Sequence, residues 1–323
     1  MACFSYKTGV WPIQVENASC RIVMNEDGTA VIQVGATEIG QGSDTVFCQM
    51  VSEIMTIPEN RLTLIPYCDT DVSPYDSGAY ASRQTYVSGG AVRKAAELLR
   101  GKLLARAAAV YDQAYESLCL ESEKIKNIET GQIICTIGQL CTFMNHTNDH
   151  VTMTEHLTAE ATYTAQSICF SYGVSYIDLD VDVPLGKVKI NKVYSVHDSG
   201  QILNPALSHG QLHGGIAMGL GYALGEQLLF DPKTGRPLNN NLLDYKTPTA
   251  MDMPEGRDAR AGAGRRRRQP HRPARARARD LPRPRRRLHR LRRPLRRQYR
   301  RYRDRGNTGL LSVFFILMFV RFA

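Results

Sequence analysis

The chain has 323 residues, of which 43% are hydrophobic, and a formal net charge of +10. That length suits one large domain or two ordinary ones with a sizeable core. The charge is uneven, because residues 1–255 hold 17 Lys and Arg against 28 Asp and Glu, whereas residues 256–323 hold 24 Arg, no Lys and 3 Asp. An acidic body is followed by a basic segment, so the net charge does not indicate a body that binds nucleic acid.

The eight cysteines all lie in residues 1–255, with no CxxC pair and no regular spacing. This pattern argues against a disulfide framework and against a zinc finger, and it fits a reducing compartment. The first residues lack the basic-then-apolar order of a signal peptide, so we expect a cytoplasmic protein. The apolar run at 309–320 is shorter than the roughly 20 residues that span a bilayer.

The first predicted element is a β-hairpin over 19–37, where two β-rich runs flank Asp27-Gly28. The loop 35–42 leads into a predicted helix from Ser43 to Ile57, which carries an apolar face. A strand is expected at 61–70. A polar, glycine-rich loop then leads into a long helix expected from about Ala91 to Tyr111.

Residues 112–160 predict only a short helix and a strand near 131–138. A second long hairpin is expected from Tyr163, with its turn at 184–186, and a loop–helix segment follows it. The six glycines between positions 210 and 225 predict a closely packed helix, because each costs roughly 1 kcal/mol relative to alanine on an exposed helix. Its backbone should lie near another chain segment or a ligand.

Strand pairs followed by loop–helix units therefore occur twice, at 19–57 and 163–230. This order predicts an α+β fold of two related subdomains. We place the first subdomain at 1–160, an incomplete second one at 161–255, and a tail at 256–323.

Glycine-rich loops before helices can hold anions or polar rings, although ordinary turns account for most of them. Neither GxGxxG nor GxxxxGK[ST] occurs, so a nucleotide-phosphate site is not indicated. His209 and His213 share a helical face, but Gly210 stands where a zinc-protease pattern needs glutamate. Three aspartates alternate along one strand face, which favours a solvated hairpin over a calcium site: Asp178, Asp180 and Asp182.

Three long stretches together resemble one family. They are GATEIGQGSDT (35–45), DTDVSPYDSGAYASRQTYVSGGAV (69–92) and DSGQILNPALSHGQLHGGIAMGLGYAL (198–224). In order and spacing they are similar to the molybdenum hydroxylases, and in particular to the molybdenum-binding subunit of bacterial xanthine dehydrogenases. The resemblance covers residues 1 to about 255.

The resemblance implies that Gln41 hydrogen-bonds the pterin of molybdopterin, with the glycines beside it keeping the backbone close to the ring. The position of a pterin-binding glutamine in some relatives is Met218 here, although Gly214 and Gly219 still allow a close approach. Phe4 corresponds to a phenylalanine that stacks on the substrate, with core packing as the alternative. The implied cofactor contacts are Ile39, Gly40, Gln41, Gly42, Ala79, Tyr80, Ala81, Ser82, Gln84, Gly214 and Met218.

The resemblance also implies the chemistry, which is oxidative hydroxylation of purines, related N-heterocycles or aldehydes with water as the oxygen source. The cofactor would be molybdenum-molybdopterin, with FAD and 2Fe-2S clusters on partner domains or subunits. A glutamate in a Gly-Glu-Pro-Pro context acts as the base in this family. Because no Gly-Glu-Pro-Pro occurs here, and the family's preceding half with a GGFGGK-like loop has no counterpart, we expect a fragment that is inactive alone.

Two interpretations of 256–323 remain open. A basic arm would bind nucleic acid through counterion release. The absence of lysine and the excess of Arg, Pro, Ala and Gly favour instead a frameshift near codon 255. In either case the composition predicts disorder to about residue 308.

Overall fold

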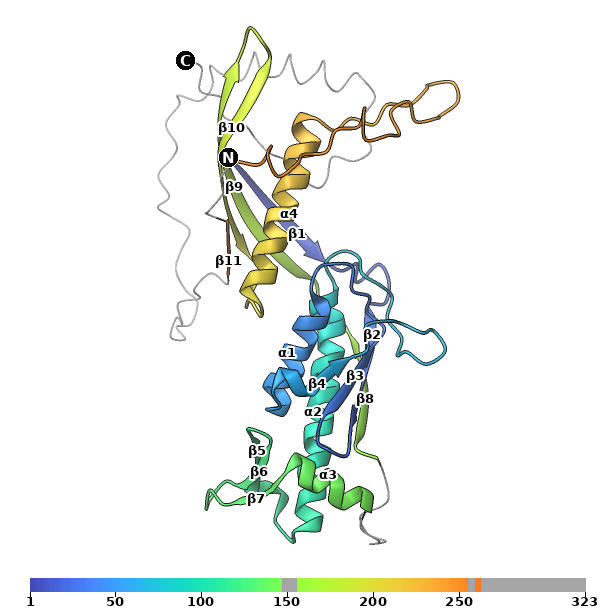
Figure 1. Ribbon diagram of the computed structural model, residues 1–323, viewed down its shortest axis with the longest axis vertical. Helices are drawn as coiled ribbons and strands as arrows, with labels where there is room; N and C mark the ends of the chain where they lie inside the picture. Colours follow the sequence, from blue (N-terminus) through green and yellow to red (C-terminus); the bar gives the residue numbers. More distant parts are fainter. Residues whose placement is uncertain (147–155, 255–258, 263–323) are drawn as a thin grey trace, which may run out of the picture. The chain divides into compact units, whose positions relative to one another are not determined.

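The computed structural model describes residues 1–146, 156–254 and 259–262 (Figure 1). The chain divides into two units. Unit 1 comprises Met1–Phe4, Tyr172–Gly200 and the chain from Leu212 onward, and unit 2 comprises Ser5–Ser171 and Gln201–Gln211. The predicted division at 160 and 255 concerns the family's subdomains and stays a prediction. Residue 160 itself lies inside strand β8 (Thr158–Thr164).

Unit 2 contains a four-stranded sheet in the order β4-β3-β2-β8. Its other strands are β2 (Asn17–Met24), β3 (Ala30–Val34) and β4 (Leu62–Leu64). Strands β2 and β3 are antiparallel and turn at Gly28, whose φ is 81°, so the predicted first hairpin is confirmed. Alternate residues of β2 are buried, as expected for a strand with one face on a core.

Two helices cover this sheet, α1 (Ser43–Met55) and α2 (Gln84–Val110). Helix α2 packs on β2 and β8, and α1 packs on α2 (Figure 1). The predicted α1 is confirmed, whereas α2 begins at Gln84 rather than at Ala91. The glycine pair before Ala91 suggested a loop, but it lies inside the helix. A Cβ on Gly90 would come within 2.6 Å of the Tyr163 ring, so this glycine permits a close helix–strand contact.

A smaller sheet in the same unit has the order β5-β6-β7. Its strands are β5 (Leu118–Glu121), β6 (Lys124–Asn127) and β7 (Ile133–Thr136), and α3 (Ile137–His146) follows them. Short 3-10 turns stand at Glu59–Arg61 and Tyr115–Ser117. The predicted strand near 131–138 is confirmed as β7 and the short helix as α3, whereas the β5–β6 hairpin was missed.

Unit 1 is built on a sheet in the order β1-β9-β10-β11. These strands are β1 (Ala2–Thr8), β9 (Cys169–Asp182), β10 (Lys187–Asp198) and β11 (Ala259–Gly262). The antiparallel pair β9–β10 confirms the predicted second hairpin. The β pattern expected from Tyr163 proves to be two strands, because β8 pairs with β2 in unit 2.

Strand β11 lies in the segment for which composition predicted disorder, and it pairs in parallel with β10. The structure gives these four residues as a strand, and the disorder predicted for the tail stays a prediction. A sheet edge offers unpaired backbone groups to a neighbouring strand, whatever its side chains are. The rest of 255–323 lies outside the described residues.

Helix α4 (Pro205–Leu224) supplies Leu220 to a small core with Ile177, Leu179 and Val193. Close packing of its glycines is found only near its end, at Gly219 and Gly221. A Cβ on Gly210, Gly214 or Gly215 would meet no described atom within 4 Å. The predicted close packing is thus found at this end of the helix, and a ligand as the neighbour of the other three glycines stays a prediction.

Candidate functional site

The loop before α1 is organised by the carboxylate of Glu38. Its Oε1 accepts the backbone N–H groups of Gly40 at 2.7 Å and Gly42 at 2.9 Å. Its Oε2 accepts the Ser43 hydroxyl at 3.1 Å and the Asp44 N–H at 3.2 Å. The first N–H groups of a helix have no partner within the helix. Glu38 therefore caps α1 and folds the loop at the same time.

The hydrogen bonds keep Glu38 charged. Burial on its own raises the pKa of Glu38, but hydrogen bonds from the Gly42, Asp44 and Gly40 backbone and from Ser43 hold it below its ordinary value on balance. The neighbouring Asp44 responds in the opposite direction, because burial and then the Glu38 charge raise its pKa. The carboxylate of Glu38 thus lies at the start of α1, where the helix dipole favours a negative charge.

Gln41 lies where the two predicted loops meet. Its Oε1 accepts the Ile39 N–H at 2.7 Å. Its Nε2 points toward three acceptors, which are the Thr37 carbonyl at 3.2 Å, the Ser43 hydroxyl at 2.9 Å and the Gln84 side-chain oxygen. An amide nitrogen carries two hydrogens, so the three acceptors share them. Gln84 in turn donates to the Thr37 carbonyl at 2.9 Å, and the two loops form one hydrogen-bonded surface.

The two glycines beside Gln41 differ in what they permit. Both have left-handed backbones, with φ of 100° at Gly40 and 85° at Gly42. A Cβ on Gly40 would meet nothing within 4 Å, so its backbone faces open space. A Cβ on Gly42 would come within 2.5 Å of the Leu207 side chain. Gly42 is therefore explained by packing against the start of α4, and Gly40 is the one that leaves room for a ligand.

The second loop, which precedes α2, stores backbone strain at two consecutive residues. Ala81 and Ser82 have φ of 47° and 54°, a region that non-glycine residues seldom adopt. Such strain costs on the order of 1–3 kcal/mol per residue, and it concentrates at binding sites. The Ala81 carbonyl accepts the Gly9 N–H at 2.8 Å, which ties this loop to the N-terminal segment.

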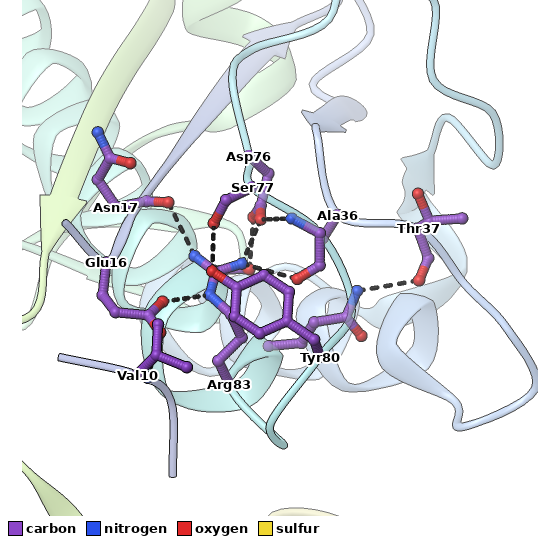
Figure 2. Close-up of polar contacts among 12 residues, drawn as sticks. Val10, Glu16, Asn17, Ala36, Thr37, Asp76, Ser77, Tyr80 and Arg83 are labelled. Carbon is purple, nitrogen blue, oxygen red and sulfur yellow. Dashed lines mark hydrogen bonds and ion pairs between the residues drawn. The ribbon is translucent and has the colours of Figure 1, made fainter. Parts of the chain in front are cut away.

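Arg83 is the support of this loop, and it is fully buried (Figure 2). It pairs with Glu16 at 2.5 Å and with Asp76, and both carboxylates are buried as well. It also donates to the carbonyl oxygens of Gly78 at 2.9 Å and Asn17 at 2.8 Å. Burial alone lowers the pKa of Arg83, but Asp76 and Glu16 raise it on balance, so the guanidinium stays charged.

The carboxylates are satisfied in turn. Glu16 accepts the Val10 N–H, and Asp76 accepts the Gly78 N–H at 3.0 Å and the Ser88 hydroxyl at 2.6 Å. A buried polar network with every member bonded specifies one conformation. Gly78 is held from both sides, because Asp76 takes its N–H and Arg83 its carbonyl. The loop is therefore built in advance of any ligand.

The side chain of Tyr80 packs and hydrogen-bonds within the protein. Its ring centre lies 5.3 Å from the Arg83 guanidinium (Figure 2). Its hydroxyl contacts the Ser77 hydroxyl at 3.1 Å and accepts from Gln14 at 2.8 Å. Ala79 and Ser82 of the same loop are exposed. The loop thus offers backbone and small side chains to its surroundings, with the larger polar groups used internally.

The remaining predicted residues lie in unit 1. Met218 of α4 is 73% exposed. Gly214 lines an apolar cleft of about 410 Å³ together with Val193, His213 and Met253. Phe4 of β1 packs its ring on Gly173 and edge-on to His197, with ring centres 5.1 Å apart. These contacts supply the packing role that was the alternative for Phe4.

The alternating aspartates of β9 face lysines across the hairpin. The register places Asp178 opposite Lys192, Asp180 opposite Lys189 and Asp182 opposite Lys187. Opposite charges on directly facing strand positions attract one another. Within the described residues, no group of three or more His, Cys, Asp or Glu side chains is arranged to hold a metal ion.

Two organising residues were missed by the sequence analysis, Glu38 and Arg83. The sequence did hold a signal for Glu38, because this acidic residue stands four positions before Gly42, the N-cap of α1. Arg83 gave no such signal. Its partner Glu16 lies 67 positions away, and arginine is rarely fully buried.

Comparison with known proteins identifies the class. Residues 1–254 match the family described as molybdopterin cofactor-binding domain, and the chain belongs to this family. It is 45% identical over 256 residues to the putative xanthine dehydrogenase molybdenum-binding subunit XdhA of Escherichia coli K12, covering 79% of this chain and 34% of that protein. It is 30% identical to the probable hypoxanthine oxidase XdhD of the same strain, covering 81% of this chain and 26% of that protein.

Solved structures agree on the fold. Quinoline 2-oxidoreductase from Pseudomonas putida 86 matches with a TM-score of 0.71 at 21% identity, over 81% of this chain and 34% of that one. A Cu,Mo-CO dehydrogenase matches with the same TM-score at 22% identity, with the same shares of each chain. The predicted family, α+β fold and molybdopterin cofactor are thereby confirmed. The chain spans about a third of the length of the first curated relative.

None of the helices in the described part of the chain has the length and apolarity that a membrane crossing requires.

The residues of the two loops fit a pterin. Gly40 leaves open space, and Ala81 and Ser82 combine a left-handed backbone with small side chains of their own. The amides of Gln41 and Gln84 lie between the loops. A flat ring with hydrogen-bonding edges suits such a surface of backbone and amide groups, because small residues let it approach.

Proposed function

We propose that this chain forms one wall of the molybdopterin site of a xanthine dehydrogenase-type hydroxylase. The proposed contacts are the ones named from the sequence, with Gln41 and the loop 79–84 as the principal ones. The observation that carries the proposal is the direct hydrogen bond between the side chains of Gln41 and Gln84. It joins two loops that are 43 positions apart and that were predicted separately to contact one ligand.

Each principal residue has a proposed task. Gln41 and Gln84 fix amide groups against the ring edge, and Gly40 leaves room for the ring face. Ala81 keeps the space beside the metal's ligands free, because its side chain is a single methyl group. When bound, the molybdenum cofactor supplies two-electron oxidation with water as the source of oxygen.

Gly214 and Met218 stay in the proposal as contacts from α4, and Phe4 as a substrate contact. Support for Gly214 is its open surroundings, since an added Cβ would meet no described atom within 4 Å. Met218 is supported by its exposure of 73%. Phe4 is the weakest of the three, because its ring already packs on Gly173.

The substrate class we propose is a purine, because the relative at 45% identity is named for xanthine and the one at 30% identity for hypoxanthine. FAD and 2Fe-2S clusters would be held by partner domains or subunits. The eight free cysteines suit a reducing, cytoplasmic setting. Nucleic-acid binding by the Arg-rich segment 256–323 stays the alternative prediction, since the family match ends at residue 254 and does not include that segment.

Activity would require more protein than this chain. General-base catalysis needs a group within reach of the proton that it removes. The family's Gly-Glu-Pro-Pro segment does not occur in this sequence. We therefore expect the purified chain to form no measurable urate from xanthine, even when supplied with sulfurated cofactor. Urate formation by this chain would contradict the proposed division of labour.

The pterin content of the purified chain tests the proposal. The chain is expressed in a bacterium that makes molybdopterin, and bound pterin is released, oxidised and quantified by fluorescence. We expect pterin in the wild-type chain and at least about a tenfold loss in Gln41→Ala, the loss that about 1.4 kcal/mol produces. Gln166→Ala, an exposed glutamine of the same unit, is the matched control and should keep its pterin. A wild-type chain without pterin would contradict the proposal.

A further inference from the structure

The carboxylate of Glu38 lies at the centre of the loop that carries Gln41. It receives three backbone N–H groups and one hydroxyl, all between 2.7 and 3.2 Å. Two of the N–H donors belong to Gly40 and Gly42, which have left-handed backbones. The N–H groups of the alternate residues Gly40, Gly42 and Asp44 converge on one point, and the carboxylate of Glu38 occupies that point.

The same turn sets the surroundings of Gln41. The Ile39 N–H, which precedes Gly40, is bonded to Gln41 Oε1 at 2.7 Å. Ser43, which bonds Glu38 Oε2, also accepts from Gln41 Nε2 at 2.9 Å. Rotation of the loop away from Glu38 would therefore break the bonds that hold the amide of Gln41 in place.

The arrangement of donors around residue 38 requires a carboxylate rather than an amide. A neutral amide in place of the carboxylate would keep one acceptor oxygen, but at the other position its NH2 group would face the donors that the carboxylate now accepts. The facing residues from neighbouring helices, Gln84 of α2 and Leu207 of α4, are uncharged. Asp44 on α1 is the titratable neighbour. Its pKa is raised first by burial and then, to a smaller extent, by the charge of Glu38. The carboxylate of Glu38 is thus the anionic group bonded to the loop's backbone.

We propose that Glu38 is a positioning residue for the cofactor. Through Gly40, Gly42 and Asp44 its carboxylate holds the loop in the conformation that presents Gly40 and Gln41 to molybdopterin. This inference rests on the proposed function of the loop. Glu38 itself does not touch the cofactor, and it acts through the backbone that it holds.

The first experiment measures the loop without the cofactor. Amide hydrogen exchange at Gly40 and Gly42 is compared between the full chain and its Glu38→Gln variant. Glu53→Gln, at an exposed acid of α1, is the matched control. We expect about tenfold or faster exchange in Glu38→Gln, as loss of a charge-assisted hydrogen bond implies, and unchanged exchange in Glu53→Gln. Unchanged exchange in Glu38→Gln would overturn the inference.

The second experiment measures pterin content in the same variants beside Gln41→Ala. The inference predicts at least about a tenfold loss of pterin in Glu38→Gln, comparable with that in Gln41→Ala, and no loss in Glu53→Gln. Wild-type content in Glu38→Gln beside a loss in Gln41→Ala would overturn the inference alone. Wild-type content in Gln41→Ala would contradict the proposed site, and the inference with it.

Discussion

Replacing Arg83 with methionine should nearly unfold unit 2. The substitution fills similar space but leaves the carboxylates of Glu16 and Asp76 without a counter-charge, at 1% and 0% side-chain exposure. Breaking a buried ion pair in this way costs about 3–5 kcal/mol. Two carbonyl groups, of Asn17 and Gly78, also lose their donor, at about 1 kcal/mol each.

The expected loss of unfolding free energy is therefore on the order of 5–7 kcal/mol. Domains of this kind are stable by roughly 5–15 kcal/mol, so the variant should lie close to its unfolding threshold. Arg93→Met is the matched control, because Arg93 is 54% exposed and pairs with Glu97 at 3.2 Å. Arg93→Met should lower the free energy of unfolding by about 0.5 kcal/mol or less.

Urea unfolding measures both variants through the fluorescence of the single tryptophan, Trp11, which lies in unit 2 between Val10 and Glu16. A shift in midpoint at an unchanged slope reports stability directly. The reasoning would be refuted if Arg83→Met lost no more than about 1 kcal/mol, or no more than Arg93→Met, because the buried network would then not support the loop.

Three further outcomes follow from the backbone and from burial. Gly42→Ala should lower the free energy of unfolding by about 1–3 kcal/mol more than Gly40→Ala, measured by urea unfolding. Both glycines have left-handed backbones, but only at Gly42 would an added Cβ meet Leu207, at 2.5 Å. Equal losses of stability in the two variants would contradict this. Ser82→Gly should raise the unfolding free energy by about 1 kcal/mol by relieving a φ of 54°, and a loss of stability would refute the strain. Burial lowers the pKa of His197, so the unfolded chain binds its proton more readily and stability should fall as pH drops below about 6.5. Urea unfolding at pH 7.5 and 5.5 should show that the free energy of unfolding falls less in His197→Gln than in the wild-type chain. An equal fall in both chains would exclude His197 as its source.

Local patterns predicted the elements whose cause is local. The turn at Asp27-Gly28 and the apolar spacing after Ser43 determine a hairpin and a helix within their own residues, and both were found. The long hairpin β9–β10 followed in the same way from alternation around Gly186. The motifs at 35–45 and 69–92 were predicted to contact one ligand, and the structure brings Gln41 and Gln84 into contact.

What sequence could not predict depends on residues far apart in the chain. The burial of Arg83 requires Glu16 and Asp76, and the pairing of β8 with β2 joins positions more than 130 apart. The start of α2 was placed too late because Gly90 suggested a break, whereas its partner Tyr163 makes glycine necessary there. Helix α4 shows the reverse error, since a count of glycines could not tell a packed helix face from an open one.

The central claim is that the loops around Gln41 and Ser82 form one molybdopterin-binding surface. Amide hydrogen exchange of the full chain, measured with and without bound molybdopterin, tests it most directly. The account predicts slower exchange on binding at residues 39–42 and 79–84 together, with little change in β5, β6 and β7. Protection confined to other segments, or none at either loop, would contradict the claim.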